Sequence, residues 1–377
     1  MVVRSERHTA APLLRRHYER GTAGGTIGAS DLETKLALIE AVSMAVGRDL
    51  LTGTAIDDPL RVLHLNAENG QDELDRQVAA ICLRYGLSQA DLGDRLFMHS
   101  VRDRPLRIVT LNGNGYEVDE TILQWLEDFI LKNAIDAVQI IPLVSFHAVR
   151  ESDNTDMDVV IKEGLGAIAG RTHCAMEIFH QPGKSKSGAT VTTVADARGA
   201  SAIVNPMHSI RVISVMSTKE ATKFLVGGDE RELYIKVSNS KVDAWPVGEP
   251  IWLKLDPVVL PSGDQVVCAV PWSPPGPAEN ATAEQLAQFR NLVQGGLYSK
   301  DERSPQWIGN AIAAVLKIDL SADNPQALAK VKAIIEAVEC KDGKRRKRAG
   351  KRGGDYSGAG VAKSRAAPKR SRQGATT

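Results

Sequence analysis

Two hydrophobic periods alternate along the first 215 residues of the chain. Short apolar runs, typical of buried strands, are separated by segments whose apolar residues recur at helical spacing. The predicted strands are 61–65, 106–111, 137–143, 175–180 and 210–216, and the predicted helices are 36–46, 72–85, 117–133, 156–170 and 200–207. Alternation of this kind favours a parallel sheet covered by helices on both faces. The sequence therefore predicts a doubly wound α/β domain over residues 1–215.

The pattern changes after residue 216. Short β-rich runs separated by Pro and Gly predict antiparallel strands at 232–238, 251–255, 258–260 and 265–270. We interpret residues 216–275 as a β extension of the core. Residues 271–277 read as a linker, and helical spacing at 284–297, 306–316 and 324–338 predicts a small helical, winged-helix-like unit over 276–340.

Composition indicates an ordinary globular protein. The 377 residues are 43% hydrophobic and 25% charged, which is enough to bury a full core. The sequence has no apolar run long enough to span a bilayer, and residues 1–20 carry charges without an apolar signal core, so we expect a cytoplasmic protein without membrane contact. Cys82, Cys174, Cys268 and Cys340 form no CxxC pair, so neither a metal site nor a disulfide framework is predicted.

The net charge of +1 conceals a strong asymmetry. Residues 341–377 contain 13 Lys/Arg and 2 Asp, whereas the other 340 residues carry 34 Lys/Arg against 44 Asp/Glu. This tail is too polar to fold alone, and we expect it to be disordered. Its basic run, Lys344, Arg345, Arg346, Lys347 and Arg348, predicts an arm that contacts nucleic-acid phosphates without reading sequence. A solvated, flexible extension is the alternative.

Residues 28–35 stand where a phosphate-binding loop, G-x-x-x-x-G-K-[ST], would be expected. The segment begins Gly28, Ala29, Ser30, but the places of the second glycine, the lysine and the hydroxyl hold Glu33, Thr34 and Lys35. A carboxylate in the glycine position brings negative charge toward a polyphosphate. Lys35 comes one residue late, turned about 100° around the helix. The sequence thus predicts a nucleotide site that is disabled or rebuilt.

Six segments resemble one family in the right order, over roughly residues 18–340. They are LHLNAENGQDELDRQVAAIC, AVQIIPLVSFHAV with ESDNTDMD after it, EIFHQPGK, DARGASAIVN, SIRVISVMSTKEA and YIKVSNSKVDAWP. Together they are similar to the RepA-type, RecA-like AAA ATPases, which are hexameric DNA-dependent ATPases and helicases of plasmids and other mobile elements. The resemblance implies ATP and Mg²⁺ as cofactors, a homo-oligomeric ring, and DNA, expected to be single-stranded, as partner.

The resemblance also implies roles for residues at strand ends. Glu68 matches the acidic residue that activates the attacking water, although a surface Glu that starts the next helix would look the same. His180 matches a sensor histidine, with a satisfied polar residue as the alternative. Ile141 stands in the position of the Mg²⁺-linked aspartate of the family. Asp136 cannot substitute for that aspartate, because it lies about 16 Å back along the strand.

Further basic residues match positions at subunit or DNA contacts in the family. Arg211 and Arg198 match arginines that reach a neighbour's γ-phosphate, and Arg211 is the preferred candidate for this role. Either arginine could equally form an interface ion pair. Lys184 and Lys186 lie in a Gly- and Ser-rich loop and are candidate DNA contacts. Lys241 matches a family lysine, but a charge on a sheet edge would look identical.

These observations predict a RepA-like ATPase-family protein that acts in DNA replication of a plasmid or mobile element, with impaired ATP binding and hydrolysis. Whether the chain is an enzyme stays open. The rival is a non-enzymatic DNA-binding or scaffolding subunit that keeps the fold. A third possibility is a decaying gene copy or a sequence error across residues 29–35.

Overall fold

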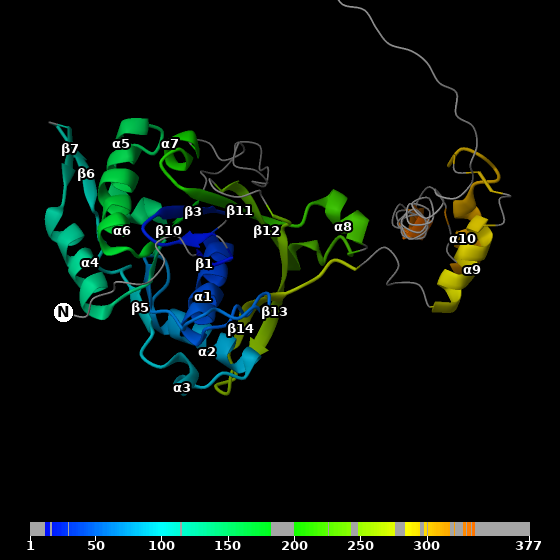
Figure 1. Ribbon diagram of the computed structural model, residues 1–377, viewed down its shortest axis with the longest axis horizontal. Coiled ribbons are helices and arrows are strands. Elements are labelled where there is room, and N and C mark those ends of the chain that lie inside the picture. Colours follow the sequence, from blue (N-terminus) through cyan, green and yellow to red (C-terminus); the bar gives the residue numbers. More distant parts are fainter. Residues whose placement is uncertain are drawn as a thin grey trace, which may run out of the picture. The chain divides into compact units, whose positions relative to one another are not determined.

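Figure 1 shows the computed structural model of the chain. The structure describes residues 12–15, 17–28, 30–113, 115–181, 200–224, 226–242, 248–275, 283–294, 298–299, 301–316, 320, 327–328, 330–332 and 334–335. The chain divides into two compact units, residues 1–275 and 276–377, and each is described by itself.

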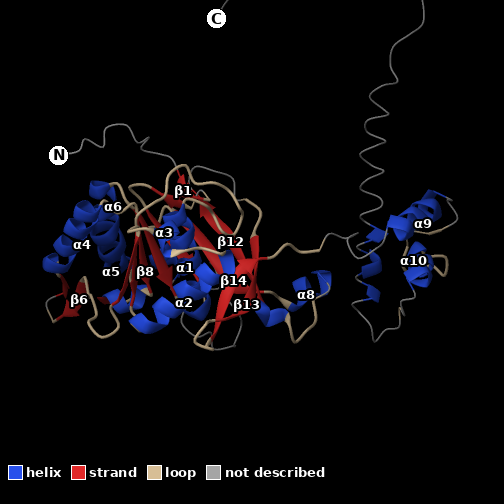
Figure 2. Ribbon diagram, turned by 90° about the horizontal axis from the view of Figure 1, so that it is seen from below, coloured by secondary structure: helices blue, strands red, loops and turns tan. Residues whose placement is uncertain are grey.

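A nine-stranded sheet forms the centre of the first unit, in the order β14-β13-β12-β11-β3-β10-β8-β4-β5. Its strands are β3 (Ala23–Ile27), β4 (Val62–Asn66), β5 (Leu96–Ser100), β8 (Ala137–Ile141), β10 (Ala175–His180), β11 (Ser209–Val215), β12 (Tyr234–Val242), β13 (Ile251–Val259) and β14 (Gln265–Pro271). The strands from β11 to β5 are parallel. β12, β13 and β14 continue the sheet with antiparallel pairing (Figure 2).

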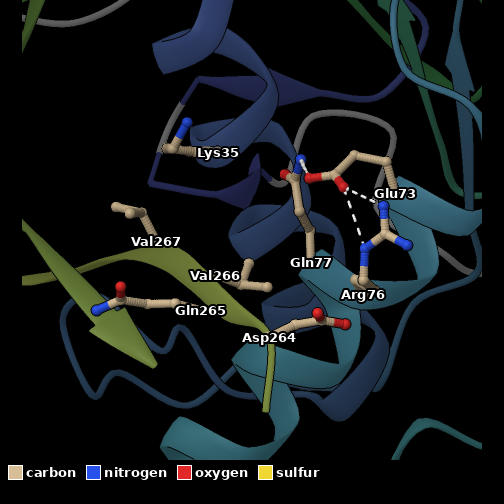
Figure 3. Close-up of a pocket in the computed structure, with 8 residues that line it drawn as sticks. All are labelled: Lys35, Glu73, Arg76, Gln77, Asp264, Gln265, Val266 and Val267. Atoms are coloured by element: carbon tan, nitrogen blue, oxygen red, sulfur yellow. Dashed lines mark hydrogen bonds and ion pairs between the residues drawn. The ribbon is translucent and has the colours of Figure 1, made fainter. Parts of the chain in front are cut away.

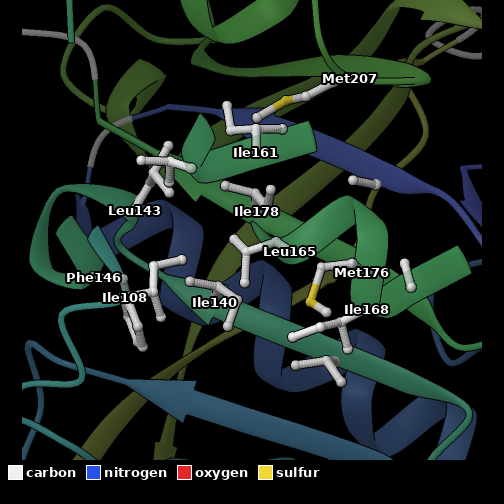
Figure 4. Packing of buried hydrophobic residues seen from close by; sticks show 14 of the residues in the cluster. Ile108, Ile140, Leu143, Phe146, Ile161, Leu165, Ile168, Met176, Ile178 and Met207 are labelled. Atoms are coloured by element: carbon white, nitrogen blue, oxygen red, sulfur yellow. The ribbon is translucent and has the colours of Figure 1, made fainter. Parts of the chain in front are cut away.

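Helices cover both faces of this sheet, which confirms the predicted α/β class. One face carries α1 (Ser30–Val46), α2 (Gln71–Tyr85) and α3 (Gln89–Leu92), which share a hydrophobic cluster with β11–β14. The other carries α4 (Glu120–Asn133), α5 (Asn154–Asp158), the π-helix Val159–Gly166, α6 (Ala167–Thr172) and α7 (Ala200–Val204). Figure 4 shows the second core, where Ile161, Leu165 and Ile168 pack on Ile140 and Ile178 of the sheet.

Some strands differ from the sequence prediction. The strand predicted at 106–111 is β6 (Val109–Asn112), which pairs with β7 (Gly115–Val118) and β9 (His147–Ala148) in a separate small sheet. The runs predicted at 251–255 and 258–260 form the single strand β13. Pro257 is tolerated there because β12 pairs only with residues 251–254, so Pro257 lies beyond that ladder.

Shorter elements complete the first unit: the hairpin β1 (Pro12–Leu14) and β2 (Tyr18–Glu19), the 3₁₀ helices Leu143–Phe146 and Arg231–Leu233, and α8 (Thr218–Phe224). In the second unit, α9 (Ala283–Gln294) and α10 (Ile308–Leu316) bury Phe289 and Ile312 together with Val331 and Ile334. Residues described between 327 and 335 are helical. Within the described chain, no helix is both long and apolar enough to cross a bilayer.

Candidate functional site

The carboxyl edge of the parallel sheet brings several predicted site residues together. Gly28 follows β3, Glu68 follows β4, Ile141 ends β8 and His180 ends β10. In open α/β sheets this edge is where ligands bind. The N–H of Gly28 donates to the carbonyl of His180 at 3.2 Å, which joins the ends of two neighbouring strands.

The turn from β3 to α1 is too short to wrap around a phosphate. β3 ends at Ile27 and α1 begins at Ser30, so Gly28 and Ala29 alone connect them. Thr34 and Lys35, expected in the loop, are already helical. The placement of Ala29 and of the Ser30 side chain lies outside the described residues. The connection therefore offers at most the amides of two residues, in addition to the first turn of α1.

Glu33 lies at the start of α1, where a phosphate group would bind at a helix N-terminus. Its side chain is fully buried, and its Oε1 accepts the N–H of Gly28 at 3.1 Å, while Oε2 has no hydrogen-bond partner. A helix N-terminus attracts negative charge, so the carboxyl group takes the place an anionic ligand would take. Burial raises the pKa of Glu33 well above its usual range, and the charge of Glu68 raises it further. Mg²⁺-ATP does not fit this cradle.

Glu68 is held by a turn at the end of β4. Asn66 Oδ1 accepts the N–H groups of Glu68 and Asn69, at 2.9 and 2.8 Å, and Gln181 Nε2 donates to Glu68 Oε1 at 2.7 Å. The half-buried Glu68 borders a cavity of about 160 Å³. The other residues that border it are Asp31, Thr34, Lys35, Asn69 and Gln77.

A larger cavity of about 510 Å³ lies beside this one, between α1, α2 and the start of β14 (Figure 3). The two cavities share Lys35 and Gln77. Arg76 and Lys35 face the larger cavity together with two carboxylates, and Arg76 already bonds Glu73 at 2.7 Å. The balance of charge there gives no preference for an anionic ligand.

The end of β8 offers no ligand for a metal ion. Ile141 is fully buried and packs with Ala37 of α1 and Phe179 of β10. Asp136 lies at the opposite end of the strand, where Arg20 contacts it at 2.7 Å and the N–H of Arg61 donates to it at 2.8 Å. Asp136 therefore has a structural role. Among the described residues, no three His, Cys, Asp or Glu side chains gather as a metal-binding group.

His180 belongs to a polar cluster with His147 and Glu151. The nearest ring nitrogen of each histidine lies 3.7 Å from Glu151 Oε1, too far for a direct hydrogen bond. Burial lowers the pKa of His180, although the charge of Glu151 opposes this shift. The sensor role of His180 stays a prediction.

Arg211 is buried in β11. Its two terminal nitrogens contact both oxygens of Glu40 at 2.6 Å, and its Nε donates to Thr26 Oγ1 at 2.7 Å. Glu177 lies 3.6 Å away. Because an arginine that reaches into another subunit must be exposed, whereas Arg211 is 2% exposed, we assign it a structural role in place of the predicted one.

The sequence prediction missed the network around Arg211. Glu40 also accepts hydrogen bonds from Arg15 at 2.6 Å and from Tyr18 at 2.9 Å, and His17 lies 2.8 Å from Glu177. One signal was available: Glu40 and Arg211 are charged residues inside apolar stretches, where the hydrophobic pattern calls for core positions.

Several predicted residues cannot be placed. Lys184, Lys186, Arg198 and the run 344–348 lie outside the described residues, and Lys241 is described only as part of the backbone of β12.

Two comparisons with known proteins found similarities to this chain. Residues 8–187 match the family described as AAA domain. The chain is similar to a solved structure described as the RadB recombinase, with 11% identity, 63% of this chain and 89% of that chain covered, and a TM-score of 0.39. A likeness of this size implies nothing about function. No curated protein matches the chain. The AAA match covers slightly less than half of the chain, so it indicates similarity to an AAA domain within that segment.

Proposed function

We propose that this chain is a RecA-like, AAA-type ATPase-family protein whose nucleotide site no longer takes ATP. The observation that carries the proposal is the buried carboxyl group of Glu33 on the N–H of Gly28. That group fills the start of α1, where the terminal phosphates of a nucleotide would lie in the family that the sequence resembles.

Three further features support weak binding of ATP and slow hydrolysis of ATP. The β3–α1 connection is two residues long, Lys35 donates to the carbonyl of Asp31 at 3.2 Å, and Ile141 stands where a metal-linked aspartate is expected. Loss of such charge stabilisation typically costs several kcal/mol in the transition state. Hydrolysis should then be slower by orders of magnitude than in an intact ATPase.

Its biological role is inferred from the resemblance. We propose action in DNA replication of a plasmid or mobile element, in a homo-oligomeric ring on single-stranded DNA, with the basic tail as a DNA contact. The filled anion site equally favours a second candidate, a non-enzymatic DNA-binding or scaffolding subunit in such an assembly. Both candidates predict negligible ATP turnover, so the test of the nucleotide site applies to both.

The test measures binding and turnover separately. Calorimetry of the full chain with Mg²⁺-ATP should show no binding heat, and phosphate release with single-stranded DNA should be negligible. The Glu33→Gly variant removes the carboxyl group beside the Gly28 N–H, which keeps its bond to the His180 carbonyl, so it should gain weak affinity for inorganic phosphate without gaining hydrolysis. The exposed Glu163→Gln is the matched control. Wild-type turnover of about one per second, an ordinary enzymatic rate, would contradict the proposal.

A further inference from the structure

The β1–β2 hairpin is held against the first unit by buried charged contacts. Its turn contributes Arg15 and His17. Arg15 contacts Glu40 at 2.6 Å and Asp49 at 3.1 Å, and both acidic residues are buried. His17, which is 2% exposed, lies 2.8 Å from Glu177. The turn therefore reaches α1, the segment that follows α1, and β10 through charged or titratable groups.

The closed hairpin leaves some of these groups incompletely satisfied. Nη1 of Arg15, Nδ1 of His17 and Oε2 of Glu177 are buried and have no hydrogen-bond partner among the described residues. The backbone of Arg15 is left-handed, with φ +47°, which is costly for a residue with a side chain. The pairing of the two strands is irregular, because the register shifts between Pro12 and Leu14. These costs offset part of the stability that the apolar residues of the hairpin supply.

The hairpin can separate while the nine-stranded sheet stays intact. β1 and β2 form a two-stranded sheet of their own, and Gly21, with φ +75°, follows β2 at the junction with β3. The buried anchors of the hairpin are Leu14 and Tyr18, which pack on α1 and on the starts of β4, β8 and β10. Opening uncovers this apolar cluster. The pairing of Glu40 with Arg211 lies between α1 and β11 and does not require the hairpin.

Protonation of His17 is unfavourable while the hairpin is closed. Burial lowers the pKa of His17 from its usual 6.5, the positive charge of Arg211 lowers it further, and Glu177 and Glu40 oppose the shift. In an open hairpin, His17 takes up a proton near its usual pKa. Closure is therefore fully stabilised above pH 6.5, and this stabilisation is lost as the pH falls from 6.5 toward the lowered pKa.

Two ion pairs at the rim of the hairpin act differently. Glu19 contacts His208 at 2.9 Å, and Arg20 contacts Asp136 at 2.7 Å. A proton on His208 strengthens its attraction to Glu19 and so opposes opening at low pH. The side chain of His208 is 28% exposed, so water screens this pair more than it screens the buried contact of His17.

We propose that the β1–β2 hairpin is a pH-sensitive switch, in which protonation of His17 releases the hairpin from α1 and β10 while the nine-stranded sheet stays folded. The switch goes beyond the proposed function, because none of its contacts involves Glu33 or the β3–α1 turn. It operates whether or not the chain binds ATP.

Hydrogen exchange of the full chain, expressed as protection factors, measures the opening between about pH 7.5 and about pH 5.5. Protection of the hairpin amides should fall by up to about tenfold per pH unit below 6.5, because opening takes up one proton. The amides of β8 should keep their protection. His17→Gln removes the titrating group and should make protection of the hairpin independent of pH. His99→Gln, exposed on β5, is the matched control and should behave like the wild type.

A second variant tests the switch if His17→Gln does not fold. Arg15→Gln removes a buried contact to Glu40 but leaves His17 in place, so protection should be lower at every pH while its pH dependence persists.

Loss of protection that is confined to the hairpin and absent in His17→Gln supports the switch. Parallel loss in the hairpin and in β8 would indicate global unfolding and overturn it. A wild-type pH dependence in His17→Gln, or none in Arg15→Gln, also overturns it. None of these results bears on the blocked nucleotide site, which calorimetry with ATP tests independently.

Discussion

The buried guanidinium of Arg211 is neutralised by carboxylates from two different elements. Glu40 comes from α1 and Glu177 from β10, so the pairing holds the helix and two strands in one arrangement. Removing one partner of such a buried pair typically costs about 3–5 kcal/mol, because the remaining charge is left uncompensated. We therefore regard this network as part of the framework that fixes α1, and with it Glu33, against the sheet.

A second buried residue makes folding stability depend on pH. His64 lies in β4, its Nδ1 is 2.8 Å from Gln139 Oε1, and burial lowers its pKa from 6.5 to about 4, with the hydrogen bond to Gln139 opposing. The folded state thus binds this proton less readily than the unfolded chain. The resulting stability is complete above pH 6.5 and is lost as the pH falls through about 4.

We expect the free energy of unfolding to decrease by roughly 2 kcal/mol between about pH 7 and about pH 5 because of His64 alone. Urea denaturation at several pH values measures it. The His64→Asn variant removes the titrating group, so its stability should change less over the same range. Equal pH dependence in both proteins would show that His64 does not carry the effect. His17, whose pKa burial also lowers, leaves a residual slope in the variant.

At the scale of single residues, the sequence located the unusual side chains but not their partners. Glu33 was recognisable as a carboxylate in a glycine position, and Glu68 as a residue at a strand end. The bond from Gly28 to Glu33 depends on where α1 begins, which the pattern did not show. The pairing of Arg211 with Glu40 spans 171 positions, so no local pattern could reveal it.

At the scale of elements, the start of α1 decides the character of the site. The hydrophobic pattern predicts a helix from residue 36, whereas α1 begins at Ser30. Asp31, Glu33 and Thr34 interrupt the apolar period, but acidic residues suit the first turn of a helix. β5 was missed for a related reason, since it is only partly buried and ends in His99 and Ser100. β10 has the predicted bounds because all of it is buried.

The backbone of β3 at Gly25 packs too closely against its neighbours to accept a side chain. A Cβ on Gly25 would lie 2.1 Å from Sδ of Met207, which is buried, and 3.2 Å from Ile210 Cδ1. Gly25→Ala should therefore destabilise the protein by about 1–3 kcal/mol through overpacking. Gly170 in α6 has no neighbouring atom within 4 Å of its Cβ position, so Gly170→Ala should be neutral or stabilising by up to about 1 kcal/mol. Urea denaturation compares the two, and equal stability of Gly25→Ala and wild type would refute the packing role.

At the scale of the whole molecule, charge is divided between an acidic body and a basic tail. Residues 341–377 carry 13 basic and 2 acidic side chains, whereas the rest of the chain has an excess of acidic ones. The placement of the tail lies outside the described residues. We expect the tail to bind nucleic acid because of its basic composition alone. Neutralising the charge of phosphates needs no fixed structure.

Deletion of residues 341–377 should weaken binding to single-stranded DNA and flatten its salt dependence. Each phosphate contact on a single strand contributes about 0.7 to the slope of log affinity against log salt concentration. Replacing the five basic residues 344–348 by Gln should then reduce the slope by up to about 3.5 while the tail keeps its length. Fluorescence anisotropy with a labelled oligonucleotide at several salt concentrations measures both variants. If the truncated chain binds as tightly and with the same slope as the full chain, the DNA contact lies in the body and the tail is a solvated extension.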